Sequence, residues 1–220
     1  MQANELISNS ILPIKPNENG ETALLLMDKF RVNHIPIVNN DFYLGIISDK
    51  EINNWDSKKE SISDHLPNIA APHVIGNQHL FDIIEVLEKN NLSVVPVLDN
   101  NQKYEGVITN RKLLYTIANS SAIQSDGGVI VIEMHKNDYS LTEISSIIEN
   151  NNSKILSSYI TSIQDSSKIE VTLKINNSDI TSIIKHLERH GYSITASYKE
   201  DEKDIDYLDR YEQLMRFLNP

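Results

Sequence analysis

The chain has 220 residues, no cysteine and a formal net charge of −11. This excludes disulfides and thiolate chemistry, and it disfavours nucleic acid, whose phosphate backbone an acidic surface repels. Because no apolar run reaches the roughly 18 residues of a membrane-spanning helix and the N-terminus shows no signal-peptide pattern, we expect a cytoplasmic protein of about two domains with no membrane partner.

The first half of the chain contains an internal repeat of about sixty residues. Pro36 aligns with Pro96, and after a one-residue loop insertion Gly45 aligns with Gly106. Each unit is predicted to run helix, strand, turn, strand, helix. The predicted first helices are 23–30 and 81–87, and the predicted first strands are 34–38 and 94–98. Because neither unit can bury a full core alone, we expect the two to pack on each other with clefts between them.

A polar, glycine-containing linker is expected at 120–128, followed by a domain over 129–200. Its apolar spacing changes from strand to helix and back in the order βαββαβ, which predicts a ferredoxin-like α/β sandwich. The predicted strands are 129–134, 154–160, 168–175 and 193–198, and the predicted helices are 141–148 and 180–187. Residues 201–220 predict a C-terminal amphipathic helix, because apolar side chains recur there at helical spacing.

Both repeats end their second strand with a hydroxyl residue at an expected helix start, namely Ser48 and Thr109. With this repeated arrangement the chain resembles the CBS domain pair, or Bateman module. The resemblance covers residues 1–119, as repeats of about 1–59 and 60–119, and rests on the segments 33–38, 44–51, 93–98 and 105–112. The family implies binding of AMP, ADP, ATP or S-adenosylmethionine between the repeats, with no other cofactor required, and it also implies homodimerisation.

In that family the hydroxyl residue lies near phosphate, and an aspartate three residues later holds the ribose. Here Glu51 and Lys112 occupy the two ribose positions. A lysine cannot accept hydrogen bonds from ribose hydroxyls, so the second site is expected to favour phosphate and the first to favour sugar. The candidate ligand-binding residues are His34, Ser48, Asp49, Glu51, Thr109, Asn110, Arg111 and Lys112.

Each of these assignments has a plain structural alternative. The spacing of Ser48 and Glu51 is also that of a capping box, which only closes the start of a helix. Lys112 is equally interpretable as a solvated surface lysine, and a histidine at position 34 occurs more often in packing than in ligand binding.

The second half resembles an ACT domain, and the combination with a CBS pair is similar to the acetoin-utilisation accessory proteins. The ACT family places a glycine at the turn from its first strand to its first helix, where an amino acid binds. Tyr139 stands near that position in this chain, which favours an assembly domain whose pocket Tyr139 fills.

The sequence contains no dinucleotide-binding, P-loop or zinc-protease motif. His186 and His190 are four residues apart and could share a helix face for a metal, but a helix C-terminus also favours histidine, so no metal site is predicted. We expect a non-catalytic, adenine-nucleotide-sensing homodimer that acts on an unknown protein target. The alternatives are a ligand-free dimeric scaffold and an enzyme without a recognisable motif.

Overall fold

A computed structural model describes residues 1–199, apart from 9, 120 and 164–165. The chain divides into two compact units between Ile117 and Ala118. The amphipathic helix predicted for 201–220 lies outside the described residues.

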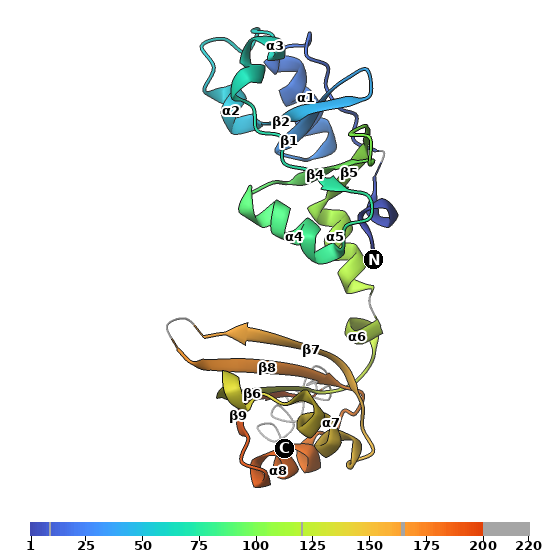
Figure 1. The fold of residues 1–220 in the computed structure, drawn as a ribbon, viewed down its shortest axis with the longest axis vertical. Coiled ribbons are helices and arrows are strands. Elements are labelled where there is room, and N and C mark those ends of the chain that lie inside the picture. Colours follow the sequence, from blue (N-terminus) through green and yellow to red (C-terminus); the bar gives the residue numbers. More distant parts are fainter. Residues whose placement is uncertain (9, 120, 164–165, 200–220) are drawn as a thin grey trace, which may run out of the picture. The chain divides into compact units, whose positions relative to one another are not determined.

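The first unit contains both repeats, each with a helix, an antiparallel strand pair and a second helix that follows directly on the strands (Figure 1). The first repeat has α1 (Gly20–Phe30), β1 (His34–Asn39), β2 (Phe42–Ser48) and α2 (Asp49–Asn53). The second has β3 (Val74–Ile75), α4 (Leu80–Lys89), β4 (Val94–Leu98), β5 (Tyr104–Thr109) and α5 (Asn110–Ala118). Short helices occupy Ala3–Leu6, Ile62–His65 and Leu66–Asn68.

The internal repeat is visible in fine detail of the backbone. The register of β1 on β2 shifts between Ile37 and Val38, and that of β4 on β5 shifts between Val97 and Leu98, which is the same place in each repeat. Opposite the first bulge, Gly45 has φ +156°, and a Cβ there would lie 2.7 Å from Ile69 Cγ2. The glycine is therefore required both by conformation and by the close approach of the inter-repeat segment.

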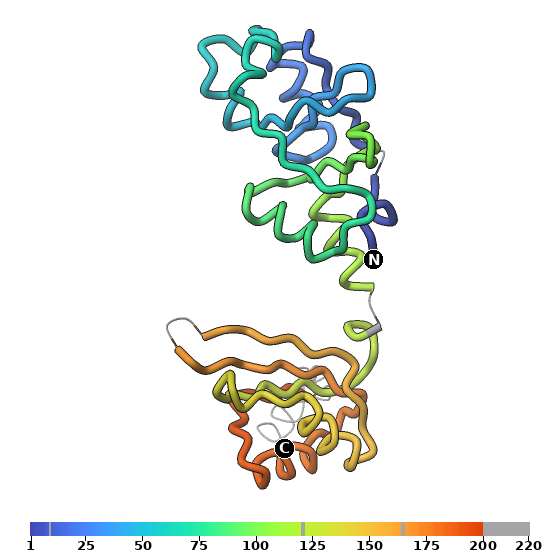
Figure 2. Tube along the Cα trace, viewed as in Figure 1, coloured from blue at the N-terminus to red at the C-terminus, as the bar shows by residue number. Residues whose placement is uncertain are grey.

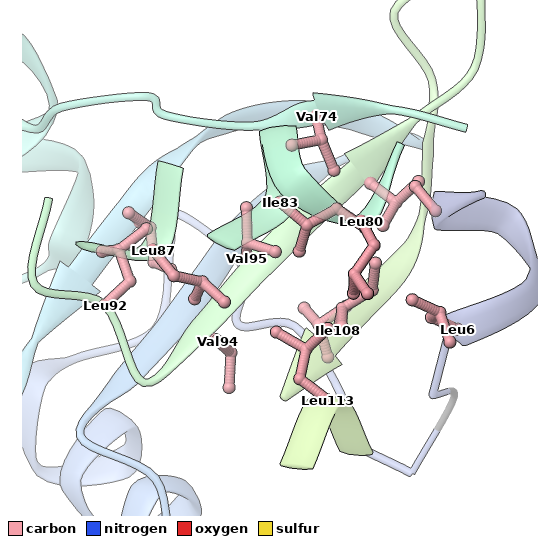
Figure 3. Close-up of a cluster of buried hydrophobic side chains, with 14 of the residues drawn as sticks. Leu6, Val74, Leu80, Ile83, Leu87, Leu92, Val94, Val95, Ile108 and Leu113 are labelled. Carbon is pink, nitrogen blue, oxygen red and sulfur yellow. The ribbon is translucent and has the colours of Figure 1, made fainter. Parts of the chain in front are cut away.

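The segments that precede the two repeats are exchanged between them. Residues 3–8 lie on the second repeat, where the Ser8 backbone N–H donates to the Val107 carbonyl at 2.8 Å, and Figure 2 shows this blue segment beside the green chain of the second repeat. Leu6 joins the same buried cluster as Ile108 (Figure 3). Conversely, the Ile46 N–H on β2 of the first repeat donates to the Ala70 carbonyl at 3.0 Å.

Buried isoleucine and valine side chains join the two repeats into one body. The cluster that forms the core of the second repeat also contains Ile46 of β2, with Tyr43 and Phe30 packed against it. The core of the first repeat is a separate cluster around Ile35, Ile47 and other buried side chains. The expectation that the repeats pack on each other is confirmed.

The second unit is a four-stranded antiparallel sheet with two helices on one face (Figure 1). The strand order is β7-β8-β6-β9, which is the ferredoxin-like order and agrees with an ACT-like domain. The elements are β6 (Val129–His135), α7 (Leu141–Glu149), β7 (Ile155–Ser162), β8 (Lys168–Ile175), α8 (Thr181–Arg189) and β9 (Ser193–Tyr198), with short helices at Ser121–Gln124 (α6) and Lys136–Asp138. Alternate residues of β8 are buried beneath the helices, as the sequence pattern predicts.

Capping side chains fix the start of two helices, of which α1 starts earlier than expected and α7 starts at the expected residue. The first helix begins at Gly20 because the Asn19 side chain accepts the Thr22 N–H. The Ser140 side chain caps α7 through the Glu143 N–H at 3.3 Å. The Glu143 carboxylate accepts a hydrogen bond from the Tyr192 hydroxyl at 3.3 Å. The linker expected at 120–128 contains the short helix α6 (Ser121–Gln124).

Candidate functional site

A pocket of about 740 Å³ opens at the start of α5 in the first unit. Its wall includes the whole first turn of that helix, so four of the predicted residues, Thr109 to Lys112, lie around one cavity. The opposite wall comes from the segment Phe30–Val32, which follows α1 in the first repeat. Ser93 and Ile11 are also among the residues that line the pocket.

The charge of this pocket is opposite to that of the chain. Arg31, Arg111 and Lys112 all line it, and among its described lining residues none is acidic. Thr109 accepts the Lys112 N–H at 3.0 Å, so the hydroxyl caps the nine-residue helix α5. The positive end of the helix dipole and three cationic side chains therefore act on one volume, which favours an anion.

Arg31 reaches the pocket because of the way that α1 ends. It has φ 56° and caps the helix through its N–H, which is bonded to the Asp28 and Met27 carbonyls. Asn91, sixty positions later, has φ 49° after α4. The two repeats thus share a left-handed residue after the first helix, and the first repeat has an arginine there.

The first repeat holds its candidate residues differently. Ser48 is buried, and both its N–H and its hydroxyl donate to Glu51 Oε2, at 2.7 and 2.6 Å. Ser48 Oγ in turn accepts the Glu51 N–H at 3.2 Å. This is a complete capping box, so one carboxylate oxygen of Glu51 is already bonded to the helix start. A ribose contact by Glu51 remains a prediction.

Asp49 lies apart from the pocket at α5. Its Oδ2 accepts a hydrogen bond from the Asn33 side chain at 3.0 Å, and it lines a separate cavity of about 430 Å³ that Arg31 also borders. Asn110, in the corresponding place of the second repeat, lines the larger pocket and donates to the Leu92 carbonyl at 3.2 Å.

His34 links the repeats through the pocket wall. The Ser93 N–H donates to His34 Nδ1 at 3.2 Å, so this nitrogen is an acceptor and the proton of the neutral ring is on Nε2. The Ser93 hydroxyl lies 3.1 Å from the same nitrogen and accepts the Asn33 N–H at 3.0 Å. Burial lowers the pKa of His34, an effect that Glu51 and Asp49 oppose and Lys50 adds to. His34 therefore holds a lining residue in place.

Sequence reasoning missed Arg31, Ser93 and Ile11 as pocket residues. They come from parts of the chain that packing, and no local motif, brings to α5. The sequence did contain one indication of the role of Ser93. Asn33 and Ser93 are sixty residues apart and occupy corresponding positions of the two repeats.

In the second unit, Tyr139 packs against the core of the ferredoxin-like fold, half-buried beside the strand-to-helix turn. His186 and His190 line a groove of about 760 Å³ on the helical side. Among the residues that the structure describes, no three histidine, aspartate or glutamate side chains gather closely enough to enclose a metal ion.

Comparison with known families matches residues 3–58 and 66–119 to the CBS domain. The chain therefore belongs to the CBS domain family, and the two matched segments are its repeats. The remaining domain has no family assignment. Within residues 1–199, apart from the gaps, no helix is long and apolar enough to cross a bilayer.

The individual relatives each match about half of this chain. Inosine-5'-monophosphate dehydrogenase of Methanocaldococcus jannaschii is 21% identical over 116 residues, which are 51% of this chain and 23% of the enzyme. A CBS domain pair/ACT domain protein of Thermotoga maritima has 11% identity and a TM-score of 0.48, covering 55% of this chain and 99% of that structure. The protein CBSX2, solved in complex with AMP, has 19% identity and a TM-score of 0.44, covering 53% of this chain and 95% of that structure.

Proposed function

We propose that this chain is a non-catalytic regulatory protein that senses an adenine nucleotide in the pocket at the start of α5. One observation carries the proposal: a chain with net charge −11 concentrates three cations and a helix N-terminus around one cavity, among whose described lining residues none is acidic. Such a site selects anions, and membership of the CBS family supports an adenosyl ligand.

The dimensions and lining suit a nucleotide. A volume of about 740 Å³ lies within the usual range of about 300–1,000 Å³ for small-molecule sites. Arg111 and Lys112 offer charge-assisted hydrogen bonds to phosphate at the helix start. Phe30, Val32 and Ile11 supply apolar surface for the flat base elsewhere in the same pocket. AMP, ADP, ATP and S-adenosylmethionine are the candidate ligands, and the phosphate esters fit this charge best.

The proposal is tested by calorimetric titration of the full chain with ATP and with adenosine. Lys112→Glu should weaken ATP about tenfold or more and change adenosine little, because the new carboxylate repels phosphate where roughly 1–3 kcal/mol of charge-assisted bonding is at stake. Lys50→Glu is the matched control, since it makes the same charge change at an exposed position on α2, outside the pocket lining.

Three results would contradict the proposal. They are equal losses for ATP and adenosine in Lys112→Glu, an ATP loss as large in Lys50→Glu, or no binding of any candidate at millimolar concentration. A ligand present at about 100 times its Kd should also stabilise the folded chain by about 2.7 kcal/mol, which thermal denaturation detects.

A second candidate function is a ligand-free dimeric scaffold, and one observation favours it. Phe81 on α4 and Leu114 on α5 are 73% and 70% exposed, although both are large apolar side chains. We propose that these exposed apolar side chains support homodimerisation in either case, and that the second unit is an ACT-like assembly domain. Nucleotide binding distinguishes a sensor from a scaffold, since only the sensor binds ATP.

A further inference from the structure

The groove between α7 and α8 has no role in the proposed nucleotide site, and two histidines occupy its wall. His186 and His190 lie one helical turn apart at the end of α8 and border the same cavity of about 760 Å³. Residues four apart on a helix share a face, and both side chains border this groove. Glu143 of α7 lines the groove opposite them.

Hydrogen bonds determine which nitrogen of each ring carries its proton. The Asn151 side-chain amide donates to the Ile147 carbonyl at 2.7 Å, which orients that amide and leaves Oδ1 toward His186. Because an amide oxygen can only accept, His186 Nδ1, 2.7 Å away, must be the donor. His190 Nδ1 likewise lies 2.8 Å from the His186 carbonyl oxygen and must donate to it.

Both neutral rings therefore have their lone pair on Nε2. This is the arrangement that metal-binding histidines adopt, because a carbonyl acceptor at Nδ1 fixes the ring and raises the basicity of the other nitrogen. A pair of histidines at this spacing on one helix face is also the pairing found in helical zinc sites. The spacing and the two hydrogen bonds are independent observations, and both indicate the same chemistry.

We propose that His186 and His190 bind one divalent transition-metal ion through their Nε2 atoms, with zinc or copper as the preferred metals. Imidazole suits these borderline ions, whereas magnesium and calcium select oxygen ligands. Among the described residues no group of three histidine, aspartate or glutamate side chains could hold a metal, so the protein supplies two ligands and water supplies the others. The site is separate from the nucleotide pocket and does not depend on the function proposed for it.

The test is calorimetric titration of the full chain with zinc chloride, in parallel with His186→Gln, His190→Gln and the control His73→Gln. His73 belongs to the first unit and lines neither this groove nor the neighbouring cavity that His190 borders. The parent and the control should bind one zinc ion per chain, and each groove variant should bind at least tenfold more weakly. Circular dichroism verifies that the variants are folded.

A second measurement needs no variant. Long-range proton–nitrogen correlation spectra of the parent should show Nδ1-protonated rings for both groove histidines, and zinc should shift both of their Nε2 resonances. Absence of zinc and copper binding by the parent overturns the proposal, as does binding that neither groove substitution weakens. Nε2-protonated rings in the metal-free chain would also overturn it, since the hydrogen-bond argument would then be wrong.

Discussion

Replacing Ser93 by alanine should weaken the first unit by removing the hydroxyl that joins the two repeats. Ser93 Oγ accepts the Asn33 N–H at 3.0 Å and lies 3.1 Å from His34 Nδ1, to which it donates. Each such bond contributes about 0.5–1.5 kcal/mol net. Asn33 is exposed, so water replaces part of the loss. We therefore expect a decrease of about 1–2 kcal/mol in the free energy of unfolding.

The assay uses the single tryptophan. Trp55 packs against the core of the first repeat and stacks on His65 with ring centroids 3.8 Å apart, so its fluorescence reports on the first unit. Urea unfolding followed at Trp55 should show a lower midpoint with an unchanged slope in Ser93→Ala. Ser57→Ala, the same change at an exposed position, should stay within about 0.5 kcal/mol of the parent. A midpoint for Ser93→Ala equal to that of this control would refute the reasoning.

Two further predictions concern the same unit. Because burial lowers the pKa of His34 below its ordinary value of 6.5, the folded chain binds that proton more weakly than the unfolded chain does. The contribution of neutral His34 to the free energy of unfolding should be complete above pH 6.5. It should decrease as the pH falls from 6.5 through the lowered pKa of His34 in the folded chain. Urea midpoints measured across this range should show a slope that is smaller in His34→Gln. Light scattering should also measure about twice the single-chain mass of 25.0 kDa. Leu114 is an apolar side chain that is 70% exposed, so the substitution Leu114→Glu should weaken the dimer and shift the measured mass toward that of one chain. A single-chain mass for the parent at micromolar concentration contradicts dimerisation.

The repeat could be predicted from the sequence because its information is local and occurs twice. Paired positions such as Gly45 and Gly106 required the same backbone, and their strands carry bulges at corresponding residues. The helix opening at Thr109 was readable for the same reason, since a hydroxyl residue that caps a helix is a short-range signal.

The rest of the pocket depended on packing between distant segments. Arg31 lines the pocket because α1 ends in a left-handed residue and the first repeat packs against the second. No motif near position 31 predicts its place beside α5. The role of Glu143 was missed for a similar reason. Its spacing from Ser140 predicts a capping box, yet its carboxylate is bonded to Tyr192, forty-nine positions later. Local patterns therefore predicted the elements, and tertiary contacts decided what their side chains do.

The exchanged segments affect how the chain folds during synthesis. Leu6 belongs to the core of the second repeat, and the Ser8 N–H is bonded to the Val107 carbonyl on β5. Residues 3–8 are therefore made well before β5 and have no complete partner until β5 has been made. Contacts between such distant positions slow folding, because the loop must close before they stabilise it. The second repeat therefore completes its core only after these distant segments have met, whereas the core of the first repeat is a separate cluster.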